Sequence, residues 1–306
     1  MGSRLVLAVL RSQSQVFFQA RWVTGLLFLL AFTVADARMA VFAVLGAAVQ
    51  SLLSWMVPGV DRQDVVEGKH GFCGALTGAA ACAALGFSLA ALAWAIIGSA
   101  ACVALVLLAG SRPVAGWGLP AMTAPFCVAS GIAMLATRSL QTTPAPPVYT
   151  PTGSLIDPLF AVLTSFSQVV LLDNVWSGAL ILLGLFLAGW ETGVWALAGA
   201  AVASATGWAL DHDASAVING LHGYNGVLVA LALGTVFLHT ERRRFPVAIV
   251  GIALTVPVRI LLARTGIPVY TWPFVLVTWG MLLLDRWFIQ KYLGSHRHGA
   301  RSPVQP

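Results

Sequence analysis

The sequence predicts an all-α integral membrane protein built from two inverted-topology repeats. Three observations support this fold class. Of the 306 residues, 58% are hydrophobic and only 9% are charged. Apolar runs of spanning length recur along the chain, and three sequence blocks of the first half return in the same order in the second. Soluble domains carry about 25% charged residues, so hydrocarbon is the better solvent for so apolar a chain.

Ten apolar stretches are long enough to cross a hydrocarbon core about 30 Å thick as helices. The first half holds the stretches 21–37, 39–59, 71–88, 90–110 and 119–137, and the second half holds 175–190, 192–210, 219–239, 246–263 and 268–287. Two shorter apolar segments, near 5–18 and 157–172, precede the two sets. We expect these short segments to dip into the membrane and return, or to lie at its surface.

The stretch between the two sets predicts a water-exposed linker. It is rich in Pro and Thr, as in Gln141-Thr142-Thr143-Pro144-Ala145-Pro146-Pro147, and such composition favours extended backbone. The chain therefore divides into a first repeat at 1–138, an extracytoplasmic linker at 139–154, a second repeat at 155–290 and a basic cytoplasmic tail at 291–306.

Basic residues predict the orientation. They gather in Asp61 to Lys69, around Arg112, at Arg242 to Arg244 and in the C-terminal tail, whereas the linker region carries only Arg138. Positively charged loops stay on the cytoplasmic side. We therefore expect both termini inside a plasma or inner membrane, embedded in the lipid bilayer. Because the basic clusters follow apolar runs, they argue against a nucleic-acid partner despite eleven Trp residues.

Three blocks carry the internal repeat, at offsets of 153, 152 and 148 residues. Ser14-Gln15-Val16 matches Ser167-Gln168-Val169, and the seven residues from His70 to Leu76 match those from His222 to Leu228. The block Gly118 to Phe126 matches Gly266 to Phe274. Each half holds five spans, an odd number, so the second half enters the membrane from the opposite side. Such inverted repeats place their sites near the midplane, between the repeats.

The third block contains a Pro-x-x-Thr-x-Pro pattern within a hydrophobic run. Prolines free backbone carbonyls, which are costly in lipid, so this backbone should face a pore or protein. Thr123 and Thr271 add one hydroxyl each. The alternative for each copy is a kinked helix whose Thr bonds its own backbone. Because the motif occurs in two symmetric copies, we favour the interpretation that it lines a pore.

Other repeat-related pairs are candidates for the same lining. Phe72 and Tyr224 are each followed one helical turn later by a leucine, Leu76 or Leu228, on the same helix face. Ordinary packing is the alternative. Gln15 and Gln168 each offer an amide donor and a carbonyl acceptor, unless they are interfacial residues without a role.

Charge is absent from the centres of the predicted spans. Arg259 is the deepest charged residue, and we expect it to snorkel toward the surface. Ion-coupled pumps usually carry intramembrane acids, so passive conduction of an uncharged solute is favoured. We find no nucleophile–base pair and no metal spacing, which predicts no enzyme, no metal and no cofactor. The four Cys residues lie in apolar stretches and predict buried thiols.

With these blocks, the sequence resembles the urea transporter family, as a bacterial-type member. The resemblance spans about residues 10–290 and rests on the doubled Leu-Pro-x-x-Thr-x-Pro-Phe motif, with Ile267 replacing Leu in the second copy. It implies a homotrimer with one narrow urea channel per protomer, and it implies that the short segments are re-entrant helices. By motif, the resemblance assigns the pore to Gln15, Val16, Phe18, Phe72, Leu76, Thr123, Gln168, Val169, Leu171, Tyr224, Leu228 and Thr271.

Three positions depart from the family pattern. Cys73 and Leu171 stand where the family often has Asn and Phe, and the position of Gln168 is acidic in some members. Rival functions remain. His70 and His222 are repeat-related and would suit an ammonia or short-amide channel, unless they are interfacial residues at the two mouths. An ion-coupled transporter needs a titratable group in its path, and a structural membrane subunit leaves the doubled motif unexplained.

Overall fold

The computed structural model describes residues 2–111, 116–141, 148–211, 213–238 and 241–292, and helices with connecting turns are the regular structure in these ranges. The first half contains α1 (Gly2–Gln15), α2 (Trp22–Met56), α3 (Arg62–Val66), α4 (Phe72–Leu85), α5 (Leu89–Ala109), α7 (Ala124–Ala136) and the short 3-10 helix η1 (Arg138–Leu140). The second contains α8 (Asp157–Gln168), α9 (Val175–Ala188), α10 (Trp190–Leu210), α11 (Ala214–Ile218), α12 (Gly223–Leu231), the π-helical η2 (Ala232–Phe237), α13 (Glu241–Ala263) and α14 (Trp272–Tyr292).

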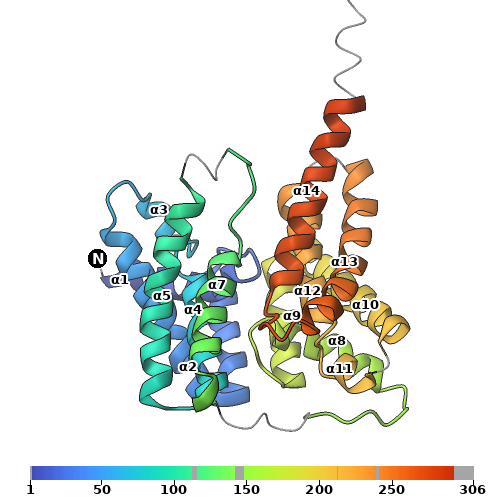
Figure 1. The fold of residues 1–306 in the computed structure, drawn as a ribbon, viewed down its shortest axis with the longest axis horizontal. Coiled ribbons are helices and arrows are strands. Elements are labelled where there is room, and N and C mark those ends of the chain that lie inside the picture. The colour runs from blue at the N-terminus through green and yellow to red at the C-terminus, as the bar shows by residue number, and fades with distance from the viewer. Residues whose placement is uncertain (1, 112–115, 142–147, 212, 239–240, 293–306) are drawn as a thin grey trace, which may run out of the picture.

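Helix length and composition make the chain an integral membrane protein. Within the described ranges, α2, α5, α10 and the part of α13 from Arg243 to Ala263 are each long and apolar enough to cross a membrane, and α4, α7, α9 and α12 with η2 are shorter apolar helices. In Figure 1 the two halves stand side by side, and α14 projects beyond the other helices. Linker residues 142–147 and tail residues 293–306 of the predicted division lie outside the described residues.

The first two predicted spans form one helix, α2, with a kink at the expected boundary. Asp36 has extended backbone angles (φ −159°, ψ 111°) within it, and its carboxylate accepts a hydrogen bond from the Arg38 backbone N–H at 2.9 Å. In the second half the helix breaks completely at Gly189, which separates α9 from α10. Asp36 and Gly189 lie 153 residues apart, the offset of the first sequence block.

The Pro-x-x-Thr-x-Pro segments are non-helical up to their threonines. We expected helices from 119 and 268, but α7 begins at Ala124 and α14 at Trp272. Pro125 therefore lies in the first turn of α7, where its missing N–H breaks no intrahelical bond. The helix starts expected at 119 and 268 are wrong, and the alternative of a kinked continuous helix does not hold either, because the backbone is non-helical before each helix starts.

Unusual backbone angles recur at matched positions of the two halves. Among the described residues, four non-glycine residues have left-handed φ angles: Phe18 (60°) with Leu171 (64°), and Met122 (46°) with Tyr270 (39°). The pairs are separated by 153 and 148 residues. Each such residue costs about 1–3 kcal/mol and persists only where its surroundings enforce it. The surroundings are therefore alike in the two halves.

Close helix crossings recur in the same way. A Cβ added to Gly25 of α2 would lie 1.9 Å from the Leu10 carbonyl oxygen of α1, and one added to Gly178 of α9 would lie 1.9 Å from that of Leu163 in α8. Only glycine allows such backbone approach. Both pairs have an offset of 153 residues, so α1 crosses α2 in the way that α8 crosses α9.

The two halves meet through α2 and α9. The Ser177 hydroxyl donates to the Ala31 carbonyl at 2.7 Å, and the Thr24 hydroxyl donates to the Gly184 carbonyl at 3.5 Å. Phe28, which is fully buried, lies against Gly184. These contacts hold the halves together beside the region where the candidate residues gather.

Candidate functional site

Five of the predicted site residues line one cavity in the first half, which we call the first-half cavity. Its volume is about 330 Å³. It is lined by Gln15, Val16, Phe18, Lys69, Phe72, Pro120, Met122, Thr123, Val236 and Phe237. The cavity therefore leads from the polar end of α1 to the central threonine, between side chains from both halves.

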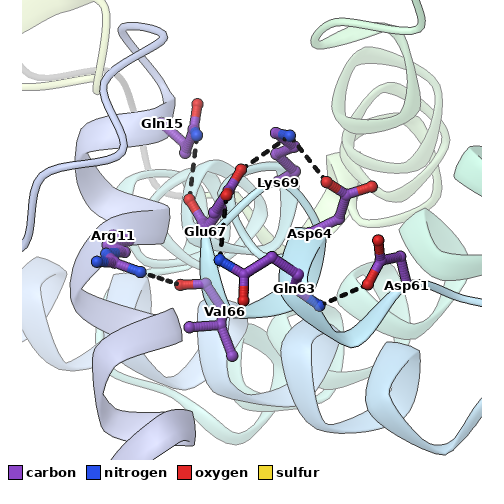
Figure 2. Close-up of polar contacts among 8 residues, drawn as sticks. All are labelled: Arg11, Gln15, Asp61, Gln63, Asp64, Val66, Glu67 and Lys69. Carbon is purple, nitrogen blue, oxygen red and sulfur yellow. Dashed lines mark hydrogen bonds and ion pairs between the residues drawn. The ribbon is translucent and has the colours of Figure 1, made fainter.

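The side chain of Gln15 has a fixed orientation at this cavity. Its Nε2 donates to the Glu67 carbonyl oxygen at 3.0 Å, and Figure 2 shows the amide oxygen on the side away from that contact. The Glu67 carboxylate in turn lies 2.9 Å from the Lys69 ammonium, which also pairs with Asp64 at 2.8 Å. These carboxylates raise the pKa of Lys69, so it stays charged at neutral pH. The polar end of this cavity is thus ordered by an ion-pair network.

Aromatic rings surround Phe18 at the same cavity. Its ring meets those of Phe237 and Phe274 edge-on, with centroids 6.1 Å away in both cases. Such edge-to-face pairs are favourable and fix the ring planes. Phe18, Phe72 and Phe237 are the aromatic side chains that line this cavity, and Phe274 packs against Phe18.

The two motif threonines contact one another where the halves meet. Their hydroxyl oxygens lie 2.7 Å apart, and each residue is only 2% exposed. The thiol of Cys127, one helical turn after Thr123, lies 3.1 Å from the Thr271 hydroxyl. Neither Thr123 nor Thr271 is therefore hydrogen-bonded only to its own helix, which was the alternative to a shared role.

A second cavity, which we call the second-half cavity, contains two more predicted residues. Its volume is about 370 Å³. It is lined by Ala83, Val148, Gln168, Leu171, Asp173, Asp213, Ser215, Ala216, Asn219 and Leu221. The Gln168 amide nitrogen donates to the Asp173 carboxylate. Gln15 and Gln168 thus occupy corresponding places in the two halves, each beside a cavity.

The remaining predicted residues are buried but line neither cavity. Tyr224 is 7% exposed, and its hydroxyl donates to the Tyr270 carbonyl at 2.5 Å. Val169, Leu76 and Leu228 are each 1% exposed or less. Tyr224 therefore supports the broken segment before Thr271, while these aliphatic side chains belong to the hydrophobic core.

Several carbonyls of the broken segments already accept hydrogen bonds from protein. The Pro120 carbonyl accepts from Trp279 Nε1 at 2.8 Å, and that of Met122 accepts from the Cys73 thiol at 3.5 Å. The Tyr270 carbonyl accepts from Tyr224, as described above. We predicted that this backbone would face either a pore or protein, and these three carbonyls face protein.

Two polar groups considered in the sequence contact one another. His222 is 1% exposed, and its Nε2 lies 2.8 Å from the Asp211 carboxylate. Arg259 is partly buried, and its guanidinium lies 3.3 Å from the same His222 nitrogen. The three side chains form a polar cluster joining α10, α12 and α13. The repeat-related His70 is only partly buried.

Comparison with known proteins shows which family the chain belongs to. A family model described as urea transporter matches residues 6–286. The chain belongs to the urea transporter family. Urea transporter 1 of Ovis aries is 25% identical over 292 residues, which is 90% of this chain and 76% of that protein, and urea transporter 1 of Capra hircus is 26% identical with the same coverage. Urea transporter 1 of Rattus norvegicus is 24% identical over 294 residues. A member of this family is a transporter and not an enzyme.

One departure from the family pattern has a visible structural consequence. Asn225 accepts a hydrogen bond from the Phe274 backbone N–H at 3.1 Å, in the first turn of α14. The matching residue in the first half is Cys73, whose thiol bonds the Met122 carbonyl instead. All four cysteines are free and buried, as expected. The urea transporter fold is thus anchored differently at its two broken segments.

Several lining residues were not among the sequence candidates. Lys69, Met122, Val236 and Phe237 line the first-half cavity, and Asp173 and Asn219 line the second. Cys127 could have been found, because it follows Thr123 by four residues and so shares its helix face. Phe237 could not be predicted from helical periodicity, because the π-helical turns of η2 change which side chains of that helix face the cavity.

Proposed function

We propose that the protein conducts urea passively, from one cavity past the Thr123–Thr271 pair to the other. The observation that carries the proposal is the 2.7 Å contact between the two motif hydroxyls, which come from opposite halves of a urea transporter family member. Phe18 and Phe72 flank one approach and Leu171 the other. Gln15 and Gln168 stand at the outer ends of the path, and Val16, Leu76, Val169, Tyr224 and Leu228 support its walls.

The chemistry of the lining suits a neutral planar molecule. Urea has four N–H donors and one carbonyl acceptor. Each of these groups that leaves water without finding a new hydrogen-bond partner costs several kcal/mol. A hydroxyl both donates and accepts. Thr123 and Thr271 can therefore exchange their mutual hydrogen bond for bonds to urea, while the aromatic rings contact its faces. An ion cannot recover its hydration energy among such groups.

The groups at the centre favour passive conduction over ion coupling. Thr123, Thr271 and Cys127 supply neutral hydroxyls and a thiol there. The carboxylate of Asp173 lines the far cavity and is bonded to Gln168. A coupled transporter needs a group that gains and loses its charge within the path. Asp173 stands at the end of the proposed path, so its charge does not have to change for urea to pass.

We infer further that the halves are inverted repeats at 1–138 and 155–290, related by a pseudo-twofold axis in the membrane plane, with the re-entrant roles given to α1 and α8. The recurring left-handed residues and glycine contacts support this. The same inference places the linker outside, both termini and the tail at 291–306 in the cytoplasm, and the protein in the plasma or inner membrane. By family likeness it assembles as a homotrimer.

Stopped-flow flux in proteoliposomes tests the function. Urea, ammonia and methylammonium would each be offered with and without proton and sodium gradients, against protein-free vesicles. The proposal expects saturable urea flux that is the same under every ion gradient. A flux that requires a gradient would instead show coupled transport, and ammonia flux without urea flux would favour the ammonia channel.

A further inference from the structure

The two pathway glutamines are held through their amide nitrogens by different kinds of partner. Gln15 Nε2 donates to a backbone carbonyl, that of Glu67, at 3.0 Å. Gln168 Nε2 donates to a side-chain carboxylate, that of Asp173. The first anchor is a neutral backbone carbonyl and the second is an acidic side chain, whose pKa is raised by burial and lowered by the Gln168 hydrogen bond, burial being the larger effect.

The backbone conformation after Gln15 is the same as that after Gln168. The two halves therefore differ in the group that accepts the hydrogen bond from the glutamine amide. The Phe18 N–H donates to the Gln15 carbonyl at 3.0 Å, and the Leu171 N–H donates to the Gln168 carbonyl, also at 3.0 Å. Phe18 and Leu171 share the left-handed φ that ends this turn. The turn delivers Asp173 to the side chain of Gln168, whereas the residue 153 positions earlier is Ala20, which has no acceptor side chain.

The side chain that corresponds to that of Glu67 contacts the linker in the second half. The residue that corresponds to Glu67, at the 152-residue offset, is Asn219. Its side chain accepts from the Tyr149 backbone N–H at 3.0 Å and donates to the Tyr149 carbonyl at 2.7 Å. Asn219 therefore ties the end of the linker to this side of the protein, and Asp173 holds the glutamine in its place.

The identity of the anchor decides which end of the amide is available to a solute. An ionised carboxylate only accepts hydrogen bonds, so the amide NH₂ must face Asp173 and the carbonyl oxygen must face away. The bond is charge-assisted and therefore stronger than one between neutral groups. Gln168 is 7% exposed and lines the second-half cavity, so its side-chain carbonyl oxygen is an acceptor available there.

We propose that Asp173 is a positioning residue for urea passage, which holds the Gln168 amide so that its carbonyl oxygen accepts an N–H of urea in the second-half cavity. This inference rests on the proposed function. A rotated amide would offer N–H donors to a solute whose edge is mostly N–H donors. That mismatch leaves polar groups unsatisfied and weakens urea binding.

A double-mutant cycle in proteoliposomes at pH 7.5 tests the assignment. Gln168→Glu sets two carboxylates against each other and should lower urea flux about tenfold, since a like-charge contact of about 1.4 kcal/mol suffices for that factor. Asp173→Asn keeps an acceptor but loses the charge, and should raise the half-saturating urea concentration about threefold. In Gln168→Glu/Asp173→Asn the new amide donates to the new carboxylate, and flux should recover to within about threefold of the wild type.

Asp213→Asn is the matched control. Asp213 lines the same cavity, and its carboxylate accepts from the Ala216 backbone N–H at 3.0 Å, a bond that asparagine keeps. Combined with Gln168→Glu, it removes the same charge from the cavity but should not restore flux. Restoration by Asp213→Asn, or additive effects of the Gln168 and Asp173 changes, would overturn the inference while wild-type urea flux persists. Absence of urea flux in the wild type would instead remove the proposed function itself.

Discussion

Phe18 and Leu171 share one backbone conformation, with φ angles of 60° and 64°, at positions 153 residues apart. Both residues end the turn after a short helix, α1 or α8, and each lines a cavity of the proposed path. The difference between them is the side chain. An aromatic ring contributes to the wall of the first-half cavity, and a branched aliphatic chain does so in the second.

Leu171→Phe should therefore narrow the second-half cavity without disturbing the turn, which already accommodates a phenylalanine at position 18. We expect N-methylurea flux to fall about tenfold, because one extra methyl group against a fitted pocket costs about 1–3 kcal/mol. Urea flux should fall less than N-methylurea flux. Stopped-flow measurement of both solutes gives the ratio of N-methylurea flux to urea flux.

Leu187→Phe on α9 is the control, because Leu187 is 57% exposed on the outside of the protein. It should leave the ratio of the two fluxes unchanged. An unchanged ratio in Leu171→Phe as well would mean that position 171 does not limit solute size.

Gly178→Ala should destabilise the protein. Its new Cβ would lie 1.9 Å from the Leu163 carbonyl oxygen, so α8 and α9 would have to separate. Overpacking of this kind costs about 1–3 kcal/mol. The comparison is Gly280→Ala in α14, where no atom lies within 4 Å of the added Cβ and alanine should stabilise the helix by about 0.5–1 kcal/mol. Thermal unfolding in detergent measures both changes. Equal melting temperatures would contradict the close crossing of α8 and α9.

The apolar helices and the contact of Thr123 with Thr271 could be predicted from sequence, because the two matched motifs and the apolar runs are local patterns. The unwound backbone before Thr123 could not, since the apolar run led us to expect a helix from 119. Other contacts between distant segments could not be predicted. Trp279 reaches the Pro120 carbonyl across 159 residues, and no periodicity indicates which carbonyl an indole will bond.

Asp173 shows a second limit of sequence reasoning. It lies five residues after Gln168, a spacing that neither a helix nor a strand would bring onto one face. The contact forms because Leu171 turns the chain through the left-handed region. The same argument applies to His222, whose contacts with Asp211 and Arg259 could not be predicted from its position in the sequence.

Urea flux should not change between pH 7 and pH 8.5. His70 lies in the turn before α4, next to Lys69 of the first-half cavity. Burial lowers the pKa of His70 below its ordinary value, and the charge of Lys69 lowers it further, against the opposing effect of Asp64. A histidine with a lowered pKa is neutral above pH 7 and gains its proton only as the pH falls further.

Flux measured at equal internal and external pH tests this expectation. His70→Gln, which cannot titrate, serves as the comparison and should give a profile of the same shape over this range. A step in wild-type flux between pH 7 and pH 8.5 that is absent from His70→Gln would show that His70 titrates there and controls passage.

The contact between Thr123 and Thr271 is the centre of the account, and valine substitutions test it most directly. Thr123→Val and Thr271→Val each keep the side-chain shape and remove one hydroxyl, while Thr255→Val removes a buried hydroxyl in α13 that bonds only the Ile252 carbonyl, at 2.6 Å, among the contacts described. Loss of a hydrogen bond worth about 1–1.5 kcal/mol should lower urea flux about five- to tenfold in each motif variant. Flux equal to that of Thr255→Val in both variants, with the protein still folded, would contradict passage of urea between the two threonines.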